Sequence, residues 1–205
     1  MNLLQIDELV FSQHYYLEPS DLCFYLKEYT SYAGFSHSYA NDLIQNFKKP
    51  MDRRGTPEWK WKLWAIREIT RLFIEAHPET PNLSHIIFVP IPPSKVKTDE
   101  LYDDRIVQVT SAFCEARNGD FREILSIKEN VEASHEAGQR PRPVEIEANL
   151  QLNPDLCQSF KDVIILVDDM ITTGAHFKAC QNKLKTVFPN AIIKGMFITR
   201  RAINL

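Results

Sequence analysis

One segment, residues 163–176 (VIILVDDMITTGAH), constrains the fold of this chain more than any other. It begins with β-branched and aliphatic residues that are typical of a buried strand. Two adjacent carboxylates, Asp168 and Asp169, follow at the predicted carboxyl end of that strand. A turn with two hydroxyls and a glycine, Thr172, Thr173 and Gly174, then leads into a predicted helix. This order of strand, polar turn and helix is typical of an α/β unit whose turn binds a ligand.

The rest of the chain repeats this alternation of apolar runs and helical patterns. Short apolar runs at 85–90, 122–127, 161–169 and 191–199 predict four core strands. Helical periodicity covers 101–117 and 176–188, and a further helix is predicted to begin at Thr56-Pro57-Glu58 and to end before Pro78. Strands that alternate with helices predict βαβ units, so we expect an α/β fold with a parallel sheet.

Residues 1–55 differ from the rest of the chain in their residue pattern, which predicts a separate N-terminal subdomain. The stretch 21–39 alternates enough to suggest an antiparallel hairpin that turns near Ala33 and Gly34, and 41–49 suggests a short helix before Pro50. We therefore divide the chain into a subdomain over 1–55 and a core over 56–205.

Composition excludes several classes of protein. The net charge is -3 over 205 residues, which gives no overall electrostatic attraction to nucleic acid or anionic membranes. Four widely spaced cysteines contain no CxxC pair, so neither a zinc knuckle nor a small disulfide scaffold is indicated. No apolar run is long enough to span a membrane, and the N-terminus lacks the basic region of a secretory signal. We expect a cytoplasmic protein with no membrane partner.

The stretch 129–152 follows neither the helical nor the strand period. Its length without regular structure is unusual inside a compact α/β domain, and such loops are often active-site lids. His135, Arg140 and Arg142 are the basic or imidazole side chains of this predicted flexible loop. The two interpretations of His135 are a general acid and a solvated loop histidine. A surface insertion with no function is the alternative.

The chemistry of residues 168–176 points to a phosphorylated sugar. Backbone N–H groups of the turn, the threonine hydroxyls and the helix N-terminus together make a cradle for a phosphate. Gly174 allows close approach of the backbone. Two carboxylates beside such a cradle would repel a bare phosphate, so their natural partners are hydroxyl groups or a cation. A phosphosugar supplies both parts. The other interpretation of the Asp168-Asp169 pair is a magnesium site of the receiver-domain or phosphatase kind.

This segment resembles the phosphoribosyl pyrophosphate (PRPP) motif of type I phosphoribosyltransferases, in which an apolar strand leads into two acids and a Thr-Thr-Gly turn. The resemblance covers roughly residues 84–200, and within the family it is strongest to ComF-like proteins. It implies a parallel-sheet core with an N-terminal hood, here residues 1–55, that selects the acceptor. It also implies Mg²⁺ bound mainly through PRPP, and homodimers are common in that fold.

The resemblance assigns roles to individual residues. Asp168 and Asp169 would hold the ribose hydroxyls, and the 5-phosphate would lie against Thr172, Thr173, Gly174, Ala175 and His176. The sequence FVPIPPSK is similar to the family's pyrophosphate loop, which places Pro93, Ser94 and Lys95 at the leaving group. The loop 129–152 lies where the family has its flexible catalytic loop, so Arg140 or Arg142 would close over pyrophosphate.

Three departures from the family pattern matter. His176 replaces the hydroxyl residue that usually closes the phosphate loop, and an imidazole N–H would have to take over. Thr172 stands where purine-salvage enzymes carry a basic carboxylate, which argues against a purine acceptor. The stretch YDDR at 102–105 does not match the corresponding Arg-Gly-Phe-Asn of ComF-like proteins.

Two functional classes follow. The first is an enzyme that transfers phosphoribose from PRPP to an unknown nucleophile with release of pyrophosphate. The second is a non-catalytic protein of the same fold that binds PRPP or a nucleotide and acts as a regulator, a DNA-uptake factor or a bacterial defence effector. Both take a small phosphosugar or nucleotide, and the second would add a nucleic-acid or protein partner.

Overall fold

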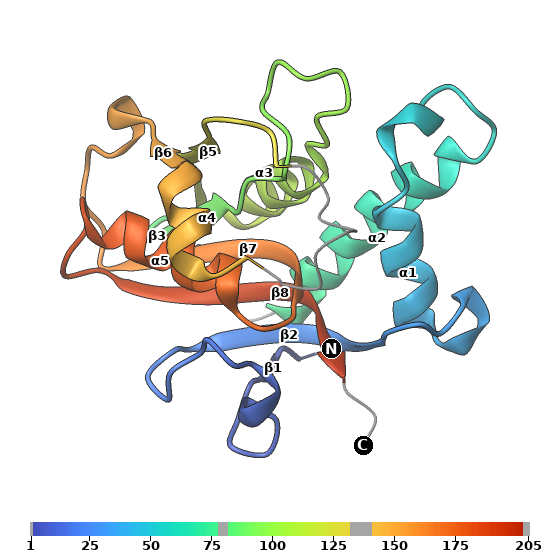
Figure 1. Ribbon diagram of the computed structural model, residues 1–205, viewed down its shortest axis with the longest axis horizontal. Coiled ribbons are helices and arrows are strands. Elements are labelled where there is room, and N and C mark those ends of the chain that lie inside the picture. The colour runs from blue at the N-terminus through green and yellow to red at the C-terminus, as the bar shows by residue number, and fades with distance from the viewer. Residues whose placement is uncertain (1, 78–81, 132–140, 203–205) are drawn as a thin grey trace.

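The computed structural model describes residues 2–77, 82–131 and 141–202, which form an α/β fold around a mostly parallel sheet (Figure 1). The strand order is β1-β2-β8-β7-β3-β4. Every neighbouring pair in this sheet is parallel except β1 with β2. This confirms the predicted α/β class with a parallel sheet. The strands are β1 (Leu4–Gln5), β2 (Cys23–Thr30), β3 (Ile86–Pro90), β4 (Asp120–Phe121), β7 (Val163–Ile171) and β8 (Ile192–Ala202).

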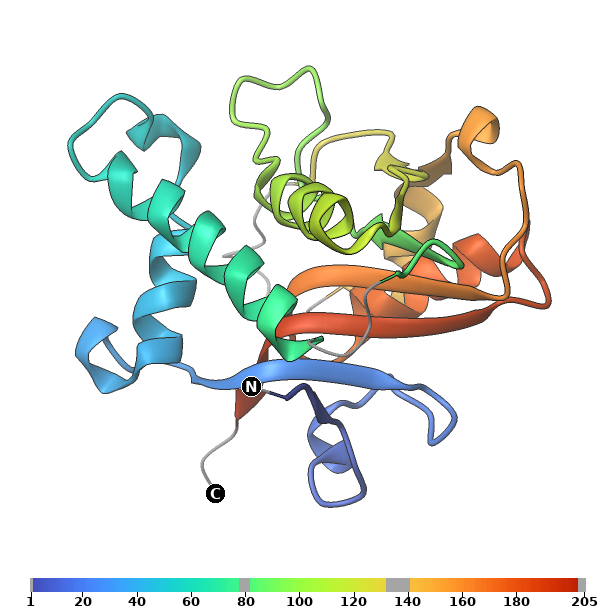
Figure 2. The ribbon, with the colours of Figure 1, turned by 180° about the vertical axis from the view of Figure 1, so that it is seen from behind.

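Helices cover both faces of this sheet. The helices are α1 (Tyr39–Phe47), α2 (Trp59–Ala76), α3 (Arg105–Arg117), α4 (Pro143–Asn149) and α5 (Ala175–Lys185). One apolar core joins the sheet to α1, α2 and α3, and a second joins it to α5. Figures 1 and 2 show α1 and α2 together at one end of the molecule, away from α4 and α5. None of the helices in the described ranges has both the length and the apolar character that a membrane span needs.

The predicted N-terminal hairpin is wrong. Residues 23–30 form a single strand, β2, which pairs in parallel with β8 and antiparallel with the short β1. Beyond Thr30 the chain turns through a 3-10 helix (Phe35–His37) into α1 rather than into a second strand. The aromatic alternation in this stretch reflects an inner strand of the main sheet, because Cys23, Tyr25 and Leu26 are buried.

Two other predictions, one about a strand and one about the loop 129–152, also need correction. The run 122–127 is not a core strand: β5 (Leu125–Ile127) pairs antiparallel with β6 (Leu150–Leu152) in a separate two-stranded sheet, and β4 takes the place beside β3. The stretch 129–152 is not irregular throughout, because its second half forms α4 and β6. The short helix 41–49 and the helices that follow 56, 101 and 175 are found close to their predicted places.

Candidate functional site

The candidate site lies where the strand connections diverge. From β3 the chain passes through α3 to β4 on one side, and from the adjacent β7 it passes through α5 to β8 on the other. In open parallel sheets, this divergence opens a crevice beyond the carboxyl ends of the two strands, and ligands bind there. The residues after β3 include the predicted pyrophosphate loop, and those after β7 are the predicted phosphate loop.

The predicted phosphate loop is a tight turn between β7 and α5. Gly174 has φ +85°, a left-handed backbone conformation that favours glycine. It is the N-cap of α5, which begins at Ala175 and so contains His176 in its first turn. The first N–H groups of a helix have no partner inside the helix, and the helix dipole makes this end positive. The loop therefore has the backbone chemistry of an anion site.

An N-terminal segment, residues 14–17, packs against this loop. The His14 ring Nδ1 is hydrogen-bonded to the carbonyl oxygen of Thr172, and the Tyr16 N–H donates to the carbonyl oxygen of Thr173 at 2.9 Å. Leu17 packs so closely on the loop that a Cβ at Gly174 would lie 2.8 Å from its Cδ2 atom. These contacts occupy two carbonyl oxygens of the loop on the side of residues 14–17.

The same segment is tied to α5. Asp21, which is buried, accepts hydrogen bonds from Lys178 and Gln181 on that helix, at 3.0 and 2.9 Å. Residues 14–21 therefore hold both the turn and the helix that it begins. Sequence reasoning missed this support, because His14 and Asp21 have no local signal that places them beside residues 172–181.

The two adjacent aspartates have different surroundings. Their side chains leave β7 on opposite sides, as consecutive residues of a strand do. Asp169 is buried and forms ion pairs with Lys48 (Nζ to Oδ1, 3.0 Å) and with Arg105 (NH2 to Oδ2, 2.5 Å). Burial alone would raise the pKa of Asp169, but the Lys48 and Arg105 charges outweigh it and lower that pKa. Both of its carboxylate oxygens are thus engaged with side chains of the protein.

The Asp169 ion pairs belong to a larger network. Arg105 also contacts Asp103 at 2.5 Å, and Asp103 accepts a hydrogen bond of 2.7 Å from Lys62. Lys62 is buried and donates to the carbonyl oxygens of Phe47 (3.0 Å), the last residue of α1, and of Lys49 (2.8 Å), just beyond it. The network joins α1, α2 and α3 to β7. The YDDR stretch that departs from the family pattern supplies two of its members, Asp103 and Arg105.

The Asp168 side chain leaves β7 on the side where the predicted phosphate loop lies. One of its oxygens, Oδ1, accepts a hydrogen bond of 2.7 Å from the Asp169 N–H. It lines a small recess together with Thr172, Gly174, Ala175 and His176. Burial, and secondarily the charge of Asp169, raise the pKa of Asp168. A ligand hydroxyl or a cation in the recess would stabilise its ionised form.

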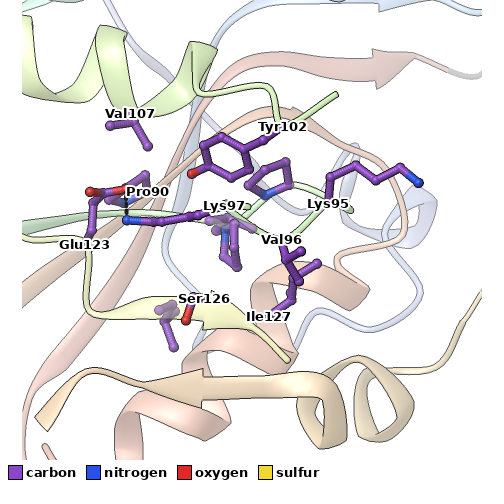
Figure 3. Close-up of a pocket in the computed structure, with 13 residues that line it drawn as sticks. Pro90, Lys95, Val96, Lys97, Tyr102, Val107, Glu123, Ser126 and Ile127 are labelled. Atoms are coloured by element: carbon purple, nitrogen blue, oxygen red, sulfur yellow. Dashed lines mark ion pairs between the residues drawn. The ribbon is translucent and has the colours of Figure 1, made fainter. Parts of the chain in front are cut away.

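The predicted pyrophosphate loop is only partly directed towards the site. Pro93 and Ser94 line a cavity of about 220 Å³ that His176 also lines, so the two predicted loops share one hollow. Lys95 is absent from that cavity. Figure 3 shows its ammonium pointing away from a neighbouring pocket, which contains Tyr102 and the Lys97–Glu123 ion pair.

The described part of the predicted flexible loop lines the 220 Å³ cavity, but Arg142 is not among the lining residues. Arg142 precedes α4 and pairs with Glu145 at 2.8 Å, and its side chain is exposed. Helix α4 lies against α5, and Glu145 and Ile146 line the 220 Å³ cavity. His135 and Arg140 fall outside the described residues.

Among the described ranges, no three histidine, cysteine or acidic side chains gather into a metal site. A Mg²⁺ ion held mostly by a ligand's oxygens would need few protein ligands. Asp168 is the carboxylate in the recess that would meet such an ion.

No protein-family model and no curated protein sequence matches this chain.

Proposed function

We propose that this protein binds a ribose 5-phosphate group, as PRPP or a nucleotide, in the crevice between β3 and β7, and transfers phosphoribose to a nucleophile. The observation that carries the proposal is the turn after β7: a left-handed glycine, a helix N-terminus and Asp168 surround one recess. The PRPP-motif resemblance of residues 163–176 supplies the ligand class. The parallel sheet is compatible with a phosphoribosyltransferase core.

The proposed reaction is a substitution at the anomeric carbon of PRPP. The lone pair of the nucleophile forms a bond to C1 while the bond from C1 to pyrophosphate oxygen breaks, and pyrophosphate leaves with the electron pair. A proton on the nucleophile passes to solvent. Mg²⁺ bound through PRPP would neutralise charge on the leaving group. The protein's part is to hold the 5-phosphate and orient the ribose, which lowers the barrier through positioning.

The geometry suggests unequal roles for the two acids. Asp168 would accept a hydrogen bond from a ribose hydroxyl, because it lines the recess and only its Oδ1 accepts a hydrogen bond from the described residues. Asp169 would act as a positioning residue, because Lys48 and Arg105 already engage its oxygens. This modifies the expectation that both acids contact the sugar.

A non-catalytic binder is the second candidate, and one observation favours it. The cavity shared by the two loops is lined by Pro93, Ser94 and His176 but by no lysine or arginine of the described residues. Departing pyrophosphate needs positive charge, so a site without such charge would bind a phosphosugar but release no pyrophosphate. In this case the protein would be a regulator, a DNA-uptake factor or a defence effector.

Thermal unfolding with PRPP and Mg²⁺ tests the binding site. At 100 times its dissociation constant, PRPP should stabilise the protein by about 2.7 kcal/mol. Ribose 5-phosphate serves as a second ligand that lacks the leaving group. No stabilisation by either compound would refute the proposal. Stabilisation that survives unchanged in Asp168→Asn would refute the role of that carboxylate.

Pyrophosphate release separates the two candidates. We expect PRPP with a panel of nucleobases and other nitrogen nucleophiles to give release with at least one acceptor if the protein is an enzyme. Binding of PRPP without release across the panel would favour the non-catalytic candidate.

A further inference from the structure

A second concave surface is formed by α1, the residues that follow it and the carboxyl end of β7. This open cleft, of about 650 Å³, is called the basic cleft below; it is lined by Tyr29, Phe35, Ile44, Gln45, Lys48, Lys49, Pro50, Arg53, Glu58 and Met170. Met170 also lines the recess that contains Asp168 and Thr172. The basic cleft is therefore adjacent to the proposed phosphosugar site, and its volume suits one small molecule.

Its charge is unlike that of the whole protein. Three of the lining residues, Lys48, Lys49 and Arg53, are cationic and only Glu58 is anionic, whereas the chain carries a net charge of -3. The Arg53 side chain, whose Nε lies 3.9 Å from an Asp52 carboxylate oxygen, is 56% exposed, and the Lys48 side chain is 44% exposed, so both groups can reach a ligand. Concentrated positive charge in a cleft favours an anionic occupant.

The cations are held on a fixed backbone. Buried Lys62 donates hydrogen bonds to the carbonyl oxygens of Phe47 and Lys49, which anchors the chain where α1 ends. The Lys49 ammonium lies 3.6 Å from Glu58, and Lys48 reaches Asp169 beneath the cleft. A pre-positioned set of charges loses less entropy on binding than mobile surface lysines do.

The remaining walls suit a flat ring. Tyr29, Phe35 and Met170 contribute aromatic and thioether surface, and Phe35 is 50% exposed. Aromatic faces and a guanidinium both stack on planar groups. Cations and rings in one cleft point to a ligand that has both a π-face and negative charge.

We propose that the basic cleft binds a small aromatic anion, a carboxylated heterocycle, and that this compound is the acceptor of the phosphoribosyl group. The location as an acceptor site rests on the proposed function, but the ligand class rests on the charges and rings of the cleft. Arg53 determines specificity by recognising the carboxylate, and Lys49, which is 13% exposed and paired with Glu58, adds positive charge beside it. Neutral bases of the same shape bind weakly.

Isothermal titration with matched pairs of compounds tests this. Pyridine and pyrimidine carboxylates are compared with the corresponding carboxamides, which keep the ring and remove the charge. We expect at least one carboxylate to bind about tenfold more tightly than its carboxamide, with affinity falling as NaCl rises. Arg53→Gln and Lys49→Gln should each weaken that carboxylate about three- to tenfold. Arg67→Gln, an exposed cation of α2 outside the cleft, should leave its affinity unchanged.

Equal binding of carboxylates and carboxamides would overturn the inference, as would no binding of any carboxylate with or without ribose 5-phosphate. Tight binding of a single-stranded oligonucleotide that Arg53→Gln abolishes, with no carboxylate binding, would assign the cleft to a different class of ligand. PRPP stabilisation is measured on the same preparations. If PRPP binds and the carboxylates do not, the acceptor inference fails while the proposed function stands.

Discussion

Asparagine substitutions at Asp168 and Asp169 should change stability in opposite directions. Asp169→Asn removes the carboxylate that pairs with Lys48 and Arg105 inside the protein. Loss of one partner from a buried ion pair typically costs about 3–5 kcal/mol. Lys48 is 44% exposed and can regain water, and Arg105 keeps its contact with Asp103, so we expect the lower end, about 3 kcal/mol. For a chain of this size the melting temperature should fall by roughly 6–12 °C.

Asp168→Asn should instead stabilise the protein at neutral and alkaline pH. The pKa of Asp168 is raised by burial and by Asp169, so the folded state disfavours its charge. An amide removes that charge and can still accept the hydrogen bond from the Asp169 N–H. The gain should be present above the raised pKa and should disappear as the pH falls below the ordinary aspartate value of about 3.9, where both states are protonated.

Urea unfolding of the wild type and the two variants, followed by circular dichroism at pH 8 and pH 5, measures both effects. A third variant, Lys48→Met, separates the contributions to the Asp169 network, because it leaves the Arg105 contact in place. Equal destabilisation by the two asparagine variants would refute the reasoning, since it would mean that the acids share one environment. Unchanged stability in Asp169→Asn would show that its ion pairs contribute nothing.

Three further substitutions test the supports of the site. Gly174→Ala should cost about 1–3 kcal/mol in urea unfolding, because alanine disfavours φ +85° and its Cβ meets Leu17; wild-type stability would contradict this. Burial lowers the pKa of His14, so below the ordinary histidine value of about 6.5 the unfolded state binds a proton more readily than the folded state. The wild type should therefore lose stability as the pH falls through that value. His14→Asn should remove this part of the pH dependence of unfolding. Lys62→Met should cost about 3 kcal/mol by leaving Asp103 and two carbonyl oxygens short of a donor, and a neutral result would show that the network is dispensable.

Local patterns predicted the elements of the site well. The β-branched run before Asp168 and the Thr-Thr-Gly turn identify β7 and the start of α5, because strand propensity and turn chemistry act over a few residues. The strand continues to Ile171, beyond the predicted end at the two acids.

Long-range partners could not be predicted in the same way. Whether Asp169 meets a sugar or a cation depends on Lys48 and Arg105, which are distant in sequence and reach it only through packing. The prediction of which strands pair fails for the same reason. β2 has the alternation of a hairpin strand, but its pairing with β8 is decided by tertiary burial. Only the folded chain shows that the two acids have separate surroundings.

The strand order has a consequence for how the protein folds. β8, the last strand along the described chain, lies between β2 and β7, and Cys23 pairs with Gly195. The sheet therefore cannot close during synthesis until the residues through β8 have left the ribosome. Pairings between such distant segments form slowly, and an unfilled place between two parallel strands exposes backbone edges that attract other chains. We expect a slow refolding phase and a tendency to aggregate before β8 inserts.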